Sequence, residues 1–191
     1  VLVFYFKKAE NANLKGAILA LLASFVLVAI ILYGIVPGFV NMAGWFDLLF
    51  VNVLGCSFNT GAIIYIILII ASIVWGLWET YKGKNEMRSR IAFCFNIIFV
   101  GIPFVGYKAW LWIVLIAAIV VFSLKWKKLS GSLMNTVLLS LMVMLIGYAS
   151  YGLTVIRSSA QPPMDQNSPD NMFSLERYLN REQYGETPLL Y

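Results

Sequence analysis

The sequence predicts an all-α membrane protein with about five transmembrane helices, one interfacial or re-entrant helix and a short extramembrane segment at its C-terminal end. Three observations predict this class. Of the 191 residues, 61% are hydrophobic and only 12% are charged, whereas a soluble domain is about half apolar and about a quarter charged. The apolar residues form long runs without a charge, and the basic residues fall between these runs rather than in one patch.

Five apolar runs are expected to cross the membrane, which makes residues 1–156 a transmembrane domain. A helix rises about 1.5 Å per residue, so about 20 apolar residues cross the roughly 30 Å hydrocarbon layer. The runs cover residues 16–37, 61–78, 91–107, 109–124 and 132–156. Because only Lys108 separates the third run from the fourth, we expect these two to form a tight hairpin.

Residues 40–58 are long enough to cross the membrane but contain Asp47, Asn41 and Asn52. An aspartate near the middle of a membrane helix costs about 3 kcal/mol, which offsets roughly six leucine-like residues. A crossing here would also move the basic residues between Lys82 and Arg90 to the other side of the membrane. We therefore expect an interfacial or re-entrant segment, in which Asp47 is either a functional acid or an ordinary interfacial one.

The basic residues predict the orientation of the chain. Ten of the 14 lysines and arginines lie before the first run, after the second or after the fourth. Cytoplasmic loops are rich in Lys and Arg, so these groups and the N-terminal end are expected in the cytoplasm. The other four are Lys108, Arg157, Arg177 and Arg181. Residues 157–191 are therefore expected on the non-cytoplasmic side of the membrane.

A polar segment rich in proline and asparagine follows Ile156, which predicts a separate extramembrane element. Ser168 can cap a helix that has Pro169 at its first position. Gly185 is suited to end that helix after about Tyr184. We therefore expect one short helix in this segment, at the start of an outer soluble region.

Three arginines are candidates for binding a lipid-linked phosphate. Arg157 directly follows the fifth apolar run, at the level of the lipid headgroups. Arg177 and Arg181 are spaced i, i+4, so their guanidinium groups would share one face of the predicted helix and grip a phosphate or carboxylate. The alternatives are interfacial anchoring for Arg157 and pairing with Glu176, Glu182 or Glu186 for the other two.

Three acids, Asp47, Asp165 and Asp170, are candidates for a role at the acceptor or for a structural role. Asp165 and Asp170 lie among prolines and asparagines, so turn formation and helix capping are the alternative to acid–base work. The chain has no histidine, no Cys or His cluster and no glycine-rich phosphate loop. It therefore identifies no metal site, no cofactor and no catalytic residue, and its dispersed basic residues argue against a nucleic-acid partner.

Two stretches are specific enough to suggest a family. The first is Gly44 to Asn52 (GWFDLLFVN), and the second runs from Ile156 to Gly185 and contains IRS, PPMD and LNREQYG. Both resemble the bacterial protein O-mannosyltransferase-like membrane family, long described as a domain of unknown function and similar to the GT-C superfamily of membrane glycosyltransferases. The resemblance covers nearly the whole chain and implies a fragment: the later part of the transmembrane domain, in a protein that continues past Tyr191.

The resemblance implies a location in the bacterial inner membrane and transfer of a sugar from a polyprenyl-phosphate donor to a protein hydroxyl on the non-cytoplasmic side. The implied partners are membrane lipid, the lipid-linked sugar and a protein acceptor. Arg157, Arg177 and Arg181 would stabilise the departing lipid phosphate. GT-C enzymes usually carry their catalytic acid in the first outer loop, and no position here matches it, so we expect the catalytic base to be absent from this chain.

A second class of function stays open, a non-catalytic membrane scaffold or a transporter. A transporter should carry ionisable residues within its spans or paired broken helices at the middle of the bilayer. The five predicted spans contain essentially no ionisable residue, which weighs against transport.

Overall fold

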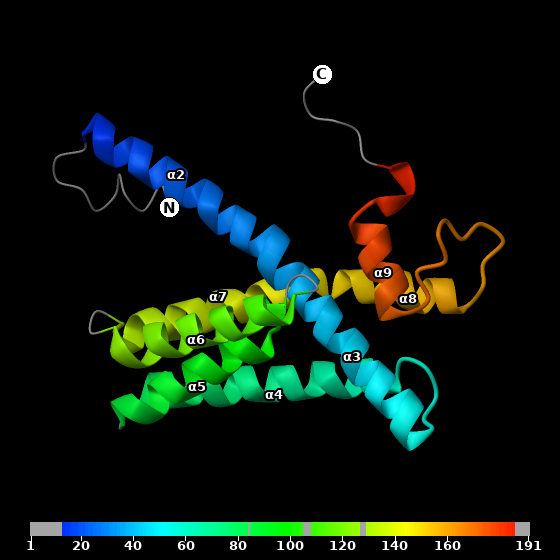
Figure 1. Ribbon diagram of the computed structural model, residues 1–191, viewed down its shortest axis with the longest axis horizontal. Coiled ribbons are helices and arrows are strands. Elements are labelled where there is room, and N and C mark those ends of the chain that lie inside the picture. The colour runs from blue at the N-terminus through cyan, green and yellow to red at the C-terminus, as the bar shows by residue number, and fades with distance from the viewer. Residues whose placement is uncertain (1–12, 84, 105–107, 127–128, 186–191) are drawn as a thin grey trace.

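The computed structural model describes residues 13–83, 85–104, 108–126 and 129–185, and all regular elements in them are helices (Figure 1). They are α2 (Leu14–Ile30), η1 (Ile31–Ile35), α3 (Val36–Leu54), α4 (Thr60–Lys82), α5 (Glu86–Phe99), η2 (Ile102–Phe104), α6 (Ala109–Lys125), α7 (Gly131–Tyr148), α8 (Ser150–Ser159), α9 (Met172–Leu179) and η3 (Glu182–Tyr184). The predicted all-helical class is confirmed for these residues.

Four helical stretches are long and apolar enough to cross a membrane. They are Leu14–Leu54, Thr60–Lys82, Glu86–Phe104 and Gly131–Ser159. α6 is also apolar but has only 17 residues. The described residues therefore hold four or five helices capable of crossing, as expected for a multi-pass membrane protein.

The first apolar run and residues 40–58 form one continuous helix of 41 residues, Leu14–Leu54, rather than two elements. The predicted end at Pro37 is wrong, because the π-helical turn η1 lies just before this proline. In that turn the N–H of Val36 donates to the carbonyl of Ile31, five residues back. The wider turn accommodates a proline that has no N–H to donate. Residues 40–54 therefore do not form a separate helix, and Asp47 lies on the continuation of the first one.

α4 to α7 lie side by side, and the long α2–α3 helix crosses them diagonally (Figure 1). α4 contacts α3, α5 and α7, while α5 and α6 pair as the predicted hairpin. The end of this hairpin meets the long helix at two glycines: a Cβ on Gly38 would collide with the Gly101 carbonyl. Gly101 also has a positive φ of 97°, so this tight turn against a neighbouring helix requires glycine. α2 extends away from α4 to α7, with most of its apolar side chains exposed.

Charged side chains hold the helices together at the end of the bundle made by residues 79–83, 85–90, 123–126 and 129–131, which we call the basic end. The Arg90 side chain is only 8% exposed and pairs with Glu86 at 2.8 Å. Its guanidinium group also donates to the carbonyls of Ser123 (3.1 Å), Trp126 (3.0 Å) and Leu129 (3.3 Å). It thereby satisfies carbonyls at the C-terminus of α6, which would otherwise lack partners.

Further inside the bundle, Asn96 joins α5 to α4. Asn96 is fully buried, and its amide donates to the carbonyls of Ser72 (3.0 Å) and Ala92 (2.9 Å). The Ser72 hydroxyl donates back to the Asn96 oxygen at 2.9 Å. Hydrogen bonds of this kind stabilise helix association where both partners are surrounded by hydrocarbon.

The fifth apolar run is also longer than predicted. α7 and α8 follow each other from Gly131 to Ser159, with Ala149 as the single residue between them. The N–H of Gly152 donates to the Ala149 carbonyl, three residues back, which tightens the chain locally at the bend. The helix therefore continues past Ile156, where the prediction ended it.

Candidate functional site

The two stretches that resemble one family meet at the end of the bundle opposite the basic end. Residues 44–52 lie on α3, and residues 156–185 form the end of α8, the following loop and α9 (Figure 1). α9 packs directly on α3. We call this region, where the ends of α3, α4, α8 and α9 come together, the α3–α9 junction.

Two hydrogen bonds between distant residues hold the junction closed. The Asn41 amide on α3 donates to a carboxylate oxygen of Glu176 on α9 at 3.2 Å. The Asn59 amide, just before α4, donates to the backbone carbonyl of Asp170 at 3.0 Å, across 111 residues of sequence. The Phe173 ring lies on Gly44, where even a Cβ would be only 2.8 Å from it.

Asp47 is buried, with 6% of its surface exposed, and it caps α4. One carboxylate oxygen accepts the N–H of Asn59 and the other accepts the N–H of Gly61, each at 3.1 Å. A carboxylate in this position satisfies free N–H groups and complements the positive end of the helix dipole. Asp47 therefore has the structural role that the sequence left open.

Asp165 and Asp170 also accept local hydrogen bonds. The Ser158 hydroxyl donates to Asp165 at 2.6 Å, which ties the loop back to α8. One Asp170 oxygen accepts from the Asn171 amide at 2.9 Å and from the Ser174 hydroxyl at 3.2 Å. Both contacts are of the turn and capping type. The structure links Asp170 to Asp47 through Asn59, whereas Asp165 lies beside the end of α8.

The predicted helix around the two later arginines is shorter than expected. It begins after Asn171, whose side chain accepts the N–H of Ser174 at 2.9 Å, and not after Ser168, which has a positive φ of 40°. It ends at Leu179, and Arg181 has a left-handed φ of 55°. The prediction that Arg177 and Arg181 share one face at i, i+4 is therefore wrong, because the helix ends between them.

The three candidate arginines are exposed. Arg157 lies inside α8 rather than just after a membrane helix, because that helix continues to Ser159. Across residues 13–83, 85–104, 108–126 and 129–185, the ion pairs involve only arginines of the basic end. Glu186, a predicted partner, lies outside the described residues. The guanidinium groups of Arg157, Arg177 and Arg181 are thus accessible, and no phosphate site is built around them here.

Glu176 is a site residue that sequence reasoning missed. Partial burial raises the pKa of its carboxyl, as does nearby Glu182, while the hydrogen bond from Asn41 and the charge of Arg177 oppose this rise. The only signal was the polar residue Asn41 in an apolar segment, and the sequence does not show that its partner lies on α9.

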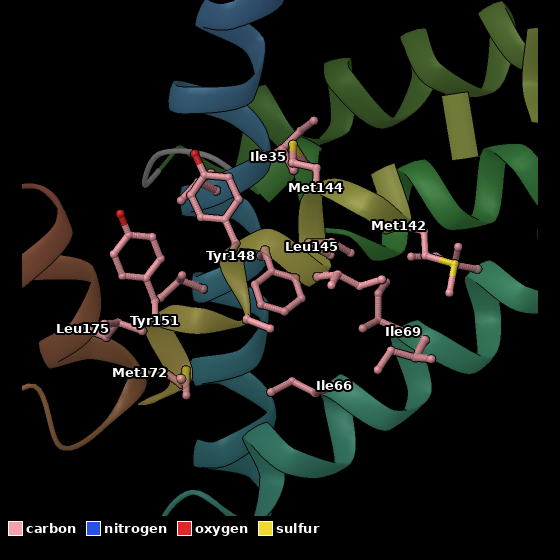
Figure 2. Close-up of a pocket in the computed structure, with 18 of the residues that line it drawn as sticks. Ile35, Ile66, Ile69, Met142, Met144, Leu145, Tyr148, Tyr151, Met172 and Leu175 are labelled. Carbon is pink, nitrogen blue, oxygen red and sulfur yellow. The ribbon is translucent and has the colours of Figure 1, made fainter. Parts of the chain in front are cut away.

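An apolar pocket of about 400 Å³ lies beside the junction, between α3, α4, the bend from α7 to α8, and α9 (Figure 2). Among the residues that line it are Phe39, Ile66, Leu145, Tyr148, Met172 and Leu175. None of the predicted arginine and aspartate candidates lines this pocket. Sequence reasoning missed it, because its walls come from several elements that are far apart in the sequence.

The described residues contain no group of three or more His, Cys, Asp or Glu side chains that could hold a metal ion. Comparison with family models, curated proteins and solved structures finds no match to this chain. The resemblance to the O-mannosyltransferase-like family and its GT-C fold stays a prediction.

Proposed function

We propose that this chain is part of an integral membrane glycosyltransferase that moves a sugar from a polyprenyl-phosphate donor to a protein hydroxyl on the non-cytoplasmic side. One observation supports this most. The two stretches that resemble such enzymes, residues 44–52 and 156–185, are far apart in sequence and pack together at the α3–α9 junction, where the Phe173 ring lies on Gly44. Hydrogen bonds from Asn41 to Glu176 and from Asn59 to Asp170 flank this contact.

The junction joins membrane-crossing helices to a polar outer segment, which is where a lipid-linked sugar and a protein acceptor would meet. The exposed arginines Arg157, Arg177 and Arg181 are free of ion pairs within the part of the chain that the structure describes. They are our candidates for stabilising the negative charge of the departing lipid phosphate. Asp47, with both oxygens held by backbone N–H groups, positions α4 and does not take the proton of the acceptor.

Transfer activity of the full-length protein tests the role of Arg157. With a polyprenyl-phosphate sugar as donor, Arg157→Ala is expected to lower donor affinity or turnover at least tenfold, about 1.4 kcal/mol, because a cation at the leaving phosphate is lost. Arg88→Ala is the matched control, since Arg88 is also exposed (64%) but lies at the basic end. Unchanged transfer by Arg157→Ala would remove this arginine from the mechanism.

Thiol labelling tests the proposed orientation in the membrane. Cysteines are introduced at Ser174 on α9 and at Ser130 before α7, in a chain whose Cys56 and Cys94 are replaced by serine. A membrane-impermeant thiol reagent on intact cells is expected to label the cysteine at position 174 and to leave the one at 130 unlabelled until the cells are opened. The reverse pattern would invert the orientation and exclude the proposed site.

A non-catalytic scaffold is the second candidate function. It is favoured by the structural use of all three candidate acids, which accept local hydrogen bonds at the junction. If the protein is a scaffold, the full-length protein should transfer no sugar from any donor. The transfer assay therefore separates the two proposals.

A further inference from the structure

The apolar pocket beside the α3–α9 junction has walls from η1, α3, α4, α7, α8 and α9 and no charged residue in its lining. Figure 2 shows Ile66 and Ile69 of α4 facing Leu145 of α7, with Met172 and Leu175 of α9 at one end. Its volume of about 400 Å³ lies in the range of roughly 300 to 1,000 Å³ that is usual for small-molecule sites. Several of its lining side chains are exposed, such as Ile70 (52%) and Ile146 (64%), so the pocket is open to the surroundings of the bundle and a ligand can enter it.

The position of the pocket indicates what kind of ligand fits. Ile66, Ile69 and Ile73 line it from the central part of α4, a helix able to cross a membrane. This places the pocket beside the hydrocarbon of the bilayer. Apolar cavities exclude water and accept apolar molecules. The lining also has flexible side chains that can adapt to the shape of a bound hydrocarbon chain, namely those of Met142, Met144 and Met172.

The charges around the pocket indicate which lipid supplies that chain. A lipid selected by its phosphate needs arginine or lysine at the pocket, and Arg157, Arg177 and Arg181 do not line it. The polar groups of its lining side chains are the hydroxyls of Tyr148 and Tyr151. The pocket therefore selects hydrocarbon and not a headgroup, and the abundant source of hydrocarbon chains at this depth is the bilayer phospholipid.

We propose that this pocket holds one acyl chain of a membrane phospholipid and that the bound chain fixes α9 against the bundle. α9 has only eight residues, too few to form a stable helix by itself. Its residues Met172, Leu175 and Leu179 lie on one face and line the pocket. A chain in the pocket extends the apolar surface on which this face is buried, so the docking of the outer segment depends on lipid.

Two glycines provide a matched pair of variants. Gly152 on α8 lines the pocket and Gly147 on α7 does not, and both have open space where a Cβ would be added. The full-length protein is purified in mild detergent, and its bound lipid is measured by native mass spectrometry. Gly147→Leu is expected to retain one phospholipid per chain as in the unmodified protein, and Gly152→Leu is expected to lose most of it.

A second pair keeps the test decisive if Gly152→Leu fails to fold. Ile66 lines the pocket and its neighbour Ile67, 61% exposed, does not, so Ile66→Trp should lose phospholipid and Ile67→Trp should retain it. Equal phospholipid in both members of a folded pair would overturn the proposal. Retention of a polyprenyl phosphate in place of phospholipid would also overturn it, and would assign the pocket to the donor instead.

Proteolysis tests the effect on α9. Delipidated full-length protein is expected to be cut in residues 160–171, between α8 and α9, severalfold faster than the same protein in phosphatidylethanolamine vesicles. Folded Gly152→Leu should show no such dependence on lipid. If the unmodified protein is cut at the same rate with and without lipid, the bound acyl chain has no role in docking α9.

Discussion

The two ends of the bundle use charged residues in opposite ways. At the basic end, Arg90 is buried and its guanidinium group is shared between Glu86 and carbonyls of the α6–α7 connection. At the α3–α9 junction the acids accept the structural hydrogen bonds, as Asp47 does at the start of α4, and Arg157, Arg177 and Arg181 are exposed. The basic end is built to hold helices together, whereas the junction keeps positive charge accessible to a ligand.

The difference follows from which backbone groups each end presents. The basic end carries free carbonyls at the C-terminus of α6, and only a donor such as Arg90 can satisfy several of them. The junction carries the free N–H groups at the N-terminus of α4, which need an acceptor such as Asp47. The backbone groups at each helix end therefore decide which sign of charge is buried there.

Replacing Arg90 should have the largest effect on stability. Arg90→Met leaves carbonyls of the α6–α7 connection without donors, and we expect a loss of about 3 kcal/mol in the free energy of unfolding. Thermal unfolding of the protein in detergent measures the change. Arg88→Met should have little effect, because Arg88 forms an exposed ion pair with Glu79. Equal midpoints of thermal unfolding for Arg90→Met and Arg88→Met would contradict the structural role of Arg90 at the basic end.

Replacing Asp47 should have the next largest effect. Asp47→Ala removes both acceptors at the start of α4, which costs about 1 to 2 kcal/mol for a helix cap. The free energy of unfolding, measured in detergent, should fall by this amount. In Asp47→Asn it should fall less, because the asparagine side chain keeps one acceptor oxygen. If Asp47→Ala unfolds like the unmodified protein, the carboxylate does not act as a cap.

Replacing Gly44 should weaken the junction locally. Gly44→Ala places a methyl group 2.8 Å from the Phe173 ring, and overpacking of this kind costs about 1 kcal/mol or more. We expect faster proteolysis between α8 and α9, with the midpoint of global unfolding nearly unchanged. Gly147→Ala is the control, because a Cβ there meets open space. Cleavage at the same rate in both variants would mean that α9 does not rest on this glycine.

The smallest effect is a dependence of α9 docking on pH. Partial burial raises the pKa of Glu176, so the docked state binds its proton more tightly than the undocked state does. The stability of docking is therefore fully present below the usual pKa of glutamate and decreases as the pH rises through the raised pKa. Hydrogen exchange of α9 amides should become faster over this range.

Glu176→Gln carries no titrating group and should remove this dependence on pH, while Glu182→Gln should leave most of it. An unchanged pH profile in Glu176→Gln would assign the effect to another group.

Much of the fold follows from local sequence, and the exceptions have identifiable physical causes. The absence of charge from residues 61–78 predicted α4, and Lys108 marked the start of α6. Pro37 was a misleading signal, because a π-helical turn absorbed it. Ser168 was another, because Asn171 provides the cap that begins α9. In both cases a residue type that often ends or begins a helix lies near the residues that form the observed turn or cap.

The sequence by itself determined that this chain is a bundle of membrane-crossing helices, because the hydrophobic effect acts on composition and on the length of each apolar run. The tertiary structure decided which polar residues meet. Asn41 faces Glu176, and Asn59 faces Asp170, only because α9 folds back onto α3. Pairings of this kind depend on the positions of elements more than 100 residues apart, which no local pattern encodes. The apolar pocket belongs to the same category, since it exists only where several distant elements come together.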